Sequence, residues 1–178
     1  MKAILQSRKV VLAKDAFLVC AFALFMVVCA NVRIHLFFTP VPITLQTFVV
    51  YVSIVALRKQ APFSQIIYIL LGMAGIPVFS NGGAGLIYLF GPTGGYILGF
   101  LVAAFMFGYL LPEKLTFRKV LFTFLSASVV IYFFGVSWLV FLHKFSLSGA
   151  IIAGVLPFVI GEIFKIVLAT FLSLKTFR

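Results

Sequence analysis

The sequence contains very few acidic residues, since only three of its 178 side chains are Asp or Glu. General acid–base catalysis needs carboxyl or imidazole groups at defined positions, and the histidines are also only two. His35 and His143 stand alone near the ends of expected loops, and no Ser, His and Asp set suggests a nucleophilic site. We therefore expect that the protein is not an enzyme.

Cysteine is equally scarce, because Cys20 and Cys29 are the only two and both lie in the first apolar run. The absence of a C-x-x-C motif and of any Cys/His cluster predicts that there is no metal site. The sequence also lacks G-x-x-x-x-G-K-S/T, the loop that cradles nucleotide phosphates. We expect no cofactor, and any ATP-driven step must be supplied by another chain.

Charged residues make up only 10% of the chain and hydrophobic residues 64%, whereas a soluble domain carries about 25% charged residues. This composition predicts an integral membrane protein. The net charge of +11 comes from Lys and Arg in small groups at the ends of apolar runs. That distribution is typical of residues that set membrane topology rather than of a nucleic-acid-binding surface.

Six apolar runs predict an all-α, multi-pass protein in which residues 1–178 form a single transmembrane domain. A full crossing needs about 20 residues, and some runs are shorter. Five of them cover residues 10–30, 44–57, 63–76, 120–142 and 147–174, and the fourth in chain order runs to about residue 111. Eleven Lys and Arg residues lie before residue 15, at 58–59, at 112–119 and at the C-terminus, whereas Arg33 and Lys144 lie on the opposite side. The positive-inside rule then places both termini in the cytoplasm, with the protein in the cell membrane.

Two segments on the outer side resist regular helix. Pro40 and Pro42 predict a loop over residues 31–43 that can fold over a site. The glycine-rich segment 79–96 is expected to dip back into the protein and form part of a pocket, because irregular backbone at membrane depth is tolerated only when buried or lining water. After it, a stripe of small residues at four-residue spacing, from Gly91 to Ala103, predicts close helix contact.

Glu162 and Lys165 lie in the middle of the last apolar run. Residues three apart share one face of a helix, so the two side chains can meet, with Phe158 on the same side. A charge at the bilayer midplane costs about 2.5–3.5 kcal/mol, and the pair must therefore face a protein interior or a wet cavity. It is either a structural ion pair or the site of a small polar ligand with both donors and acceptors.

Four motifs together resemble the BioY family, the biotin-specific S components of energy-coupling-factor transporters. In chain order they are VPITLQT at 41–47, GIPVFS at 75–80, GPTGGY at 91–96 and LPFVIGEIFK at 156–165. The resemblance covers about residues 15–170. It implies a six-helix fold, a biotin pocket that opens outward, and a lid formed by residues 32–43. It also implies partners, namely a transmembrane T component and two ATPase subunits.

The residues that we assign to biotin binding follow from these motifs and from the chemistry of the ligand. The ureido ring offers two N–H donors and one carbonyl acceptor, so a carboxylate can take the donors and an amide can serve either role. Lys165 can meet the ureido oxygen or the valerate carboxylate. Aromatic side chains suit the thioether ring. The assigned residues are Gln46, Phe79, Asn81, Tyr96, Phe158, Glu162 and Lys165.

The sequence departs from the family at two places. The family usually has Asp at the position of Glu162, and its small-x-x-x-small coupling motif on the first helix is met only by Ala16 and Cys20. Small residues there serve either packing within the chain or docking of a partner helix. Two other functions stay open: a small ion- or proton-coupled carrier that uses the Glu162–Lys165 pair as a relay, and a structural membrane protein without a ligand. A relay usually has several titratable groups along a path, and this chain offers one pair.

Overall fold

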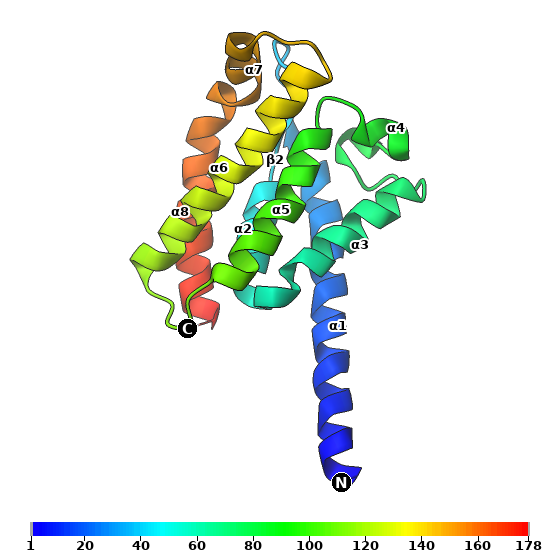
Figure 1. Cartoon of the computed structure of the whole chain (residues 1–178), viewed down its shortest axis with the longest axis vertical. Coiled ribbons are helices and arrows are strands. Elements are labelled where there is room, and N and C mark those ends of the chain that lie inside the picture. The colour runs from blue at the N-terminus through cyan, green and yellow to red at the C-terminus, as the bar shows by residue number, and fades with distance from the viewer. Residues whose placement is uncertain (1, 178) are drawn as a thin grey trace.

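The computed structural model describes residues 2–177, with side chains from residue 12 onward. Helices dominate the fold (Figure 1), and they are α1 (Lys2–Asn31), α2 (Gln46–Leu57), α3 (Ala61–Met73), α4 (Leu86–Leu89), α5 (Gly94–Leu110), α6 (Phe117–Phe141), α7 (Leu147–Gly154) and α8 (Val159–Phe177). Short 3-10 turns and a two-residue antiparallel hairpin complete it: η1 (Arg58–Gln60), η2 (Ser80–Gly82), η3 (Leu156–Phe158), β1 (Arg33–Ile34) and β2 (Ile43–Thr44). Apart from this hairpin, the all-α prediction is confirmed.

Helix α2 lies at the centre of the bundle, where it packs against α1, α5 and α8. Its residues from Val49 to Val55 are all buried, which explains why this helix is apolar on every side. Helix α1 also packs on α3, and α6 packs on α8. The start of α1 and the end of α8 lie toward the same end of the molecule (Figure 1).

The closest helix pair is formed by α5 and α6, as the small-residue stripe predicts. A side chain at Gly99 would come within 2.9 Å of the Cα atom of Ile131, and one at Gly95 would overlap Trp138. Ala103 is fully buried on the same helix. Small residues therefore let the two backbones approach closely. Such close packing is needed in lipid, where the hydrophobic effect does not drive helices together.

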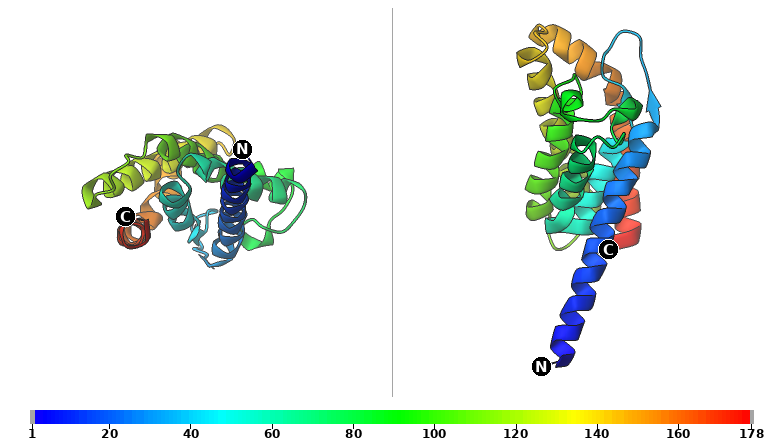
Figure 2. Two further views of the ribbon diagram at one scale, coloured as in Figure 1. Left: turned by 90° about the horizontal axis from the view of Figure 1, so that it is seen from below. Right: turned by 90° about the vertical axis from the view of Figure 1, so that its right-hand side faces the viewer.

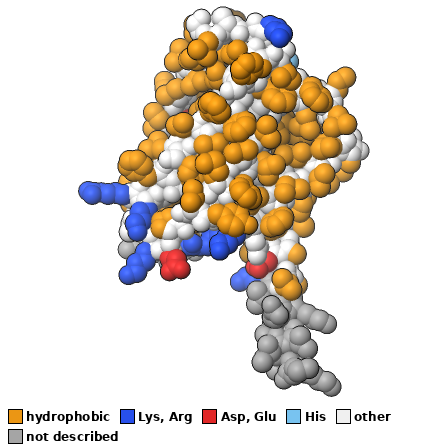
Figure 3. Space-filling model, viewed as in Figure 1, with side chains coloured by type: hydrophobic (Ala, Val, Ile, Leu, Met, Phe, Trp, Pro, Cys, Tyr) orange, Lys and Arg blue, Asp and Glu red, His pale blue; other side chains and the backbone are white. Residues whose placement is uncertain are grey.

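The outer surface of the bundle is apolar, as expected for a protein that faces lipid. Figure 3 shows hydrophobic side chains over most of the visible face, with Lys and Arg gathered at the end where α8 finishes. Three helical segments are long and apolar enough to cross a membrane, namely Leu12–Asn31, Phe117–Phe141 and Leu147–Phe177, and α5 is a shorter apolar helix. Helices α2 and α3, with 12 and 13 residues, fall short of a full crossing.

The last apolar run is not one continuous helix, which corrects the prediction for residues 147–174. It breaks into α7, the turn η3 and α8. Pro157 has no backbone N–H, so the carbonyl of Ala153, four residues earlier, loses its helical partner. The N–H of Phe158 turns instead to Val155 O at 2.9 Å, which leaves the carbonyl of Gly154 free for another donor.

Both carbonyls at this break are satisfied from other parts of the chain. The hydroxyl of Thr39, in the loop between β1 and β2, donates to Ala153 O at 2.6 Å. Tyr96 of α5 donates to Gly154 O at 2.7 Å. Figure 2 shows the loop at the same end of the bundle as α7. The break therefore fastens both the loop and α5 to the C-terminal helices.

Candidate functional site

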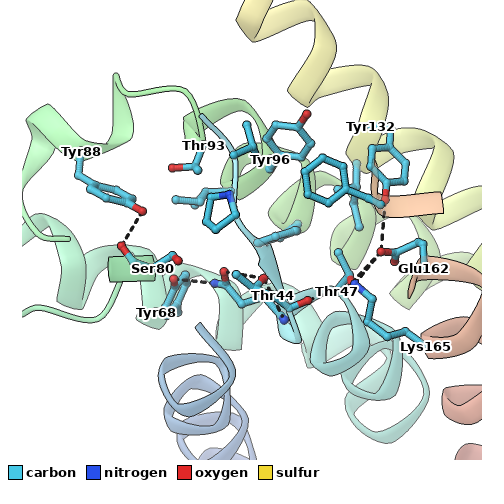
Figure 4. A pocket seen from close by; sticks show the side chains of 17 residues that line it. Thr44, Thr47, Tyr68, Ser80, Tyr88, Thr93, Tyr96, Tyr132, Glu162 and Lys165 are labelled. Carbon is cyan, nitrogen blue, oxygen red and sulfur yellow. Dashed lines mark hydrogen bonds and ion pairs between the residues drawn. The ribbon is translucent and has the colours of Figure 1, made fainter. Parts of the chain in front are cut away.

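A pocket with an empty volume of about 530 Å³ lies beneath the β1–β2 loop. Helices α2, α5, α6 and α8 form its walls, together with the segment between α3 and α5 (Figure 4). Its lining residues are Val41, Pro42, Thr44, Gln46, Thr47, Tyr68, Ser80, Tyr88, Thr93, Tyr96, Ile97, Phe100, Ile131, Tyr132, Phe158, Glu162 and Lys165.

Glu162 and Lys165 form an ion pair at one end of this pocket, which we call the charged end. The Lys165 ammonium lies 2.7 Å from Glu162 Oε2, and the two residues are only 4% and 7% exposed. The prediction that the two side chains meet and face the protein interior is therefore confirmed. A buried ion pair is tolerated only when further hydrogen bonds satisfy both groups.

Those hydrogen bonds come from α2, α6 and the segment before α2. The carboxylate of Glu162 accepts from Tyr51 at 2.5 Å, from Thr47 at 3.2 Å and from Tyr132 at 3.3 Å. The ammonium of Lys165 donates to Thr44 O at 3.1 Å and to the Thr47 hydroxyl at 2.6 Å. Both charges are thus fully surrounded by polar partners.

Neutral groups form the other end of the pocket, which we call the hydroxyl end (Figure 4). Gln46 donates to the hydroxyl of Tyr68 at 2.7 Å, and Tyr88 donates to Ser80 O at 2.7 Å. The Ser80 hydroxyl is buried and has no hydrogen-bond partner among the residues described. Thr93 adds a further hydroxyl to this lining. A buried polar group without a partner costs free energy, and the Ser80 hydroxyl is the unsatisfied group of this lining within the described residues.

Apolar and aromatic side chains connect the two ends. Ile97, Phe100, Ile131 and Phe158 line the pocket, and the ring of Tyr96 lies between the two ends in Figure 4. Val41 and Pro42 cover it from the β1–β2 loop, which Thr39 fastens to the start of the helix break. The loop therefore lies where the sequence predicts a lid.

The structure brings together most of the residues that the sequence assigns to ligand binding. Gln46, Tyr96, Phe158, Glu162 and Lys165 all line the pocket. The remaining two lie outside the lining. Phe79 is fully buried behind it, packed against the rings of Tyr68 and Tyr88, and Asn81 is exposed in η2 with a φ of 65°.

Several polar residues of the pocket were not assigned from the sequence. Thr44 and Thr47 precede or begin an apolar helix, and this polar start was the one available signal for them. Tyr51 follows Thr47 by one helical turn, so both lie on the same face of α2. Ser80 ends the GIPVFS motif and lies in the glycine-rich segment that was expected to form part of a pocket, but it was not assigned. Tyr68 and Tyr132 gave no signal, because single hydroxyls are common in apolar helices.

The two residues predicted to couple to a partner lie apart from the pocket. Ala16 and Cys20 are both exposed on α1, whereas Ala23 and Ala30 of the same helix are buried. The outward face of α1 is therefore open at Ala16 and Cys20.

Comparison with known proteins gives concordant results. The model of the BioY family matches residues 2–178. The chain is 39% identical over 137 residues to the biotin transporter BioY of Thermotoga maritima, which covers 76% of this chain and 80% of that protein. It is 37% identical over 162 residues to the probable biotin transporter BioY of Pyrococcus horikoshii, which covers 90% and 94%. The fold is similar to a crystal structure of the S-component for biotin from an ECF-type ABC transporter, with a TM-score of 0.84, 24% identity and coverage of 90% and 89% of the two chains.

Proposed function

The chain belongs to the BioY family, and we propose that it binds biotin and serves its uptake as the substrate-binding S component of an energy-coupling-factor transporter. The observation that carries this proposal is the buried Glu162–Lys165 pair in the pocket wall. The two relatives, which are 39% and 37% identical to this chain over the aligned residues, are named a biotin transporter and a probable biotin transporter. Their names and the chemistry of this pocket lead to the same ligand.

The ureido ring of biotin suits the charged end of the pocket. Its two N–H groups can donate to the carboxylate of Glu162, and its carbonyl oxygen can accept from the ammonium of Lys165. Hydrogen bonds to charged groups are roughly twice as strong as neutral ones. A ligand that offers donors and an acceptor on one rigid ring can therefore use both members of the pair.

The valerate carboxylate of biotin then lies toward the hydroxyl end. Beside Glu162 the ligand carboxylate would meet a like charge in a site of low dielectric constant, which is unfavourable. The Ser80 hydroxyl is buried and free to donate, and the Tyr68 hydroxyl, which accepts from Gln46, keeps its own proton for donation. We propose that these hydroxyls take the carboxylate, while Phe158 and Phe100 pack against the thioether ring and the valerate chain.

The proposal includes a membrane topology and partners. We propose six membrane-crossing segments in the cell membrane, with both termini in the cytoplasm, because Lys and Arg are concentrated at that end. Energy for uptake would come from a transmembrane T component and two ATPase subunits. The exposed positions Ala16 and Cys20 on α1 are where a partner helix can approach closely.

Equilibrium binding of biotin to the purified chain alone tests this proposal. We expect saturable, tight binding without partner subunits, and a large loss of affinity in Lys165→Ala. Lys175→Ala is the matched control, because Lys175 is an exposed lysine near the end of the same helix. Absence of biotin binding by folded wild-type protein would overturn the proposal. Proton or ion flux through vesicles that contain the chain alone would instead support the relay function.

A further inference from the structure

We infer that Tyr51 is the positioning residue that holds the carboxylate of Glu162 in the orientation that the ligand requires. The inference rests on the proposed function, because it concerns the same site. It assigns a role to a residue that lies outside the pocket lining, where contact with a ligand cannot explain its presence.

Tyr51 approaches Glu162 from the protein side. It is fully buried in α2 and lies outside the lining of the pocket. Its hydroxyl donates to Glu162 Oε1 at 2.5 Å, the shortest of the hydrogen bonds that the carboxylate accepts. Its ring stacks on Phe124 of α6, with the ring centres 5.2 Å apart. A buried, stacked ring has little freedom to move, so its hydroxyl is a fixed point for the carboxylate.

The second carboxylate oxygen has a different set of partners. Glu162 Oε2 is contacted by Lys165 at 2.7 Å, by Thr47 at 3.2 Å and by Tyr132 at 3.3 Å. All three of these residues line the pocket. Tyr51 therefore holds one oxygen from behind, and the other oxygen faces the residues that a ligand would meet.

Three donors on one oxygen exceed the two lone pairs that it offers. The two longest contacts, from Thr47 and Tyr132, are the weakest of the set because hydrogen bonds weaken with distance. A ligand N–H can replace one of them without disturbing the ion pair or the Tyr51 bond. The carboxylate thus has a fixed side, held by Tyr51 and Lys165, and an exchangeable side, held by Thr47 and Tyr132.

A fixed side is useful because a glutamate side chain is flexible. Glu has one more rotatable bond than Asp, and each rotamer frozen on binding costs affinity. A site whose side chains are already held in position avoids that cost. Tyr51 supplies this restraint from α2, one turn after Thr47, so a single helix face presents both the fixed and the exchangeable donor.

Biotin affinity in two hydroxyl-deletion variants tests this assignment. Tyr51→Phe keeps the ring and its packing, and we expect it to weaken biotin binding about tenfold through loss of a hydrogen bond to a charged group. Tyr132→Phe removes a donor that competes with the ligand, and we expect less than about a threefold change. The control is Thr170→Val, which deletes a fully buried hydroxyl on α8 that bonds only to Ile166 O in the structure.

A double-mutant comparison separates positioning from a merely structural role. Glu162→Asp shortens the side chain, so that its carboxylate withdraws from the Tyr51 hydroxyl. In that background Tyr51→Phe should weaken biotin binding much less than in wild type, because the contact is already broken. If Tyr51→Phe does not fold, Phe124→Leu keeps the hydroxyl but removes the ring on which it rests, and the same comparison applies with a smaller loss.

The outcomes distinguish this inference from the proposed function. If wild-type protein does not bind biotin, the proposed function fails. If wild type binds biotin and Tyr51→Phe binds equally well, only the role of Tyr51 is overturned. An equal loss in the wild-type and Glu162→Asp backgrounds would also overturn it, since Tyr51 would then act independently of the carboxylate. Melting temperatures of all variants, measured without ligand, show whether the folded fraction is comparable.

Discussion

The two ends of the pocket differ in how much of their hydrogen-bonding capacity is already used. At the charged end, the three N–H groups of Lys165 have three acceptors, at 2.7, 2.6 and 3.1 Å, and both oxygens of Glu162 accept bonds. At the hydroxyl end, the buried Ser80 hydroxyl has no partner within the part of the chain described. A ligand must therefore exchange partners at the first end, whereas it only adds a bond at the second.

This difference follows from the free energy that unpaired polar groups would cost at each end of the empty pocket. An unpaired charge inside a membrane protein costs several kcal/mol, so the empty site must neutralise Glu162 and Lys165 internally. A single unpaired hydroxyl costs about 1–3 kcal/mol, which the fold can tolerate. Substitutions at the charged end should accordingly change both stability and affinity, whereas removal of the unpaired Ser80 hydroxyl should change affinity alone.

The largest expected effect is that of Lys165→Ala. The change removes all three lysine contacts and leaves the carboxylate of Glu162 buried without its counter-ion, which costs about 3–5 kcal/mol. We expect biotin affinity to fall more than about a hundredfold and the melting temperature to drop. Binding titrations on the folded fraction measure the affinity, and thermal unfolding measures the melting temperature. Lys175→Ala is the control in both measurements. If folded Lys165→Ala bound biotin with wild-type affinity, the charged end would not contribute to biotin binding.

Glu162→Gln comes next, because it keeps the size of the side chain and one acceptor oxygen but loses the charge. A hydrogen bond to a charged group is worth about 1.5–3 kcal/mol, so affinity should fall about tenfold to a hundredfold. Isothermal titration and thermal unfolding on the same sample separate two roles. A variant that melts far below wild type, yet whose folded fraction binds biotin as tightly, would show that the carboxylate is structural.

Ser80→Ala probes the hydroxyl end and should have a smaller effect. Because the Ser80 hydroxyl has no partner to lose in the described structure, the melting temperature should stay unchanged or rise slightly. Biotin affinity should fall about tenfold, the lower end of the range for a hydrogen bond to a charged carboxylate, because the Tyr68 hydroxyl can still donate to that carboxylate.

A ligand control sharpens this test. A biotin analogue that ends in a methyl group in place of the carboxyl should bind wild type and Ser80→Ala equally. An equal loss for biotin and for the methyl analogue would mean that the carboxylate does not lie at the hydroxyl end. The orientation proposed for the ligand would then be wrong, although the charged end could still hold the ureido ring.

Ala16→Trp should leave both ends of the pocket unaffected. Ala16 is exposed on α1, so a large ring there keeps a partner helix away without disturbing the core. We expect unchanged biotin affinity for the isolated chain, together with loss of biotin uptake in cells that contain the complete transporter. Loss of binding as well would show that position 16 is needed for packing within the chain.

The comparison of the two ends also explains what the sequence could predict. Two ionisable residues in a long apolar run have few physical explanations, so Glu162 and Lys165 were assigned from sequence and lie in the pocket. Hydroxyls in apolar helices are common and carry no such signal. Tyr68 was therefore identified only in the structure. Ser80 lies in the segment that was expected to form a pocket, but the sequence favoured its neighbour Asn81, a more obvious hydrogen-bonding residue that lies outside the lining.

The fold prediction was also incomplete, because the sequence indicated the long helices but not where the last one breaks. The existence of the long helices follows from their apolar runs, and the contact of α5 with α6 follows from the small residues at Gly95 and Gly99. The break in the last helix was missed, although Pro157 was visible, because a proline can either kink a helix or end it. The surrounding contacts of Thr39 and Tyr96, far away in sequence, decide which occurs.

The missing backbone N–H of Pro157 therefore affects the position of a loop that is distant in sequence. If residue 157 carried a backbone N–H, that group would donate to the carbonyl of Ala153 in a continuous helix. Because proline has no such N–H, the carbonyl accepts a hydrogen bond from the Thr39 hydroxyl instead. The β1–β2 loop is consequently attached to the backbone at the break through Thr39. Because Thr39 contacts a backbone carbonyl, a substitution that removes a charge at Glu162 or Lys165 should leave this attachment of the loop in place.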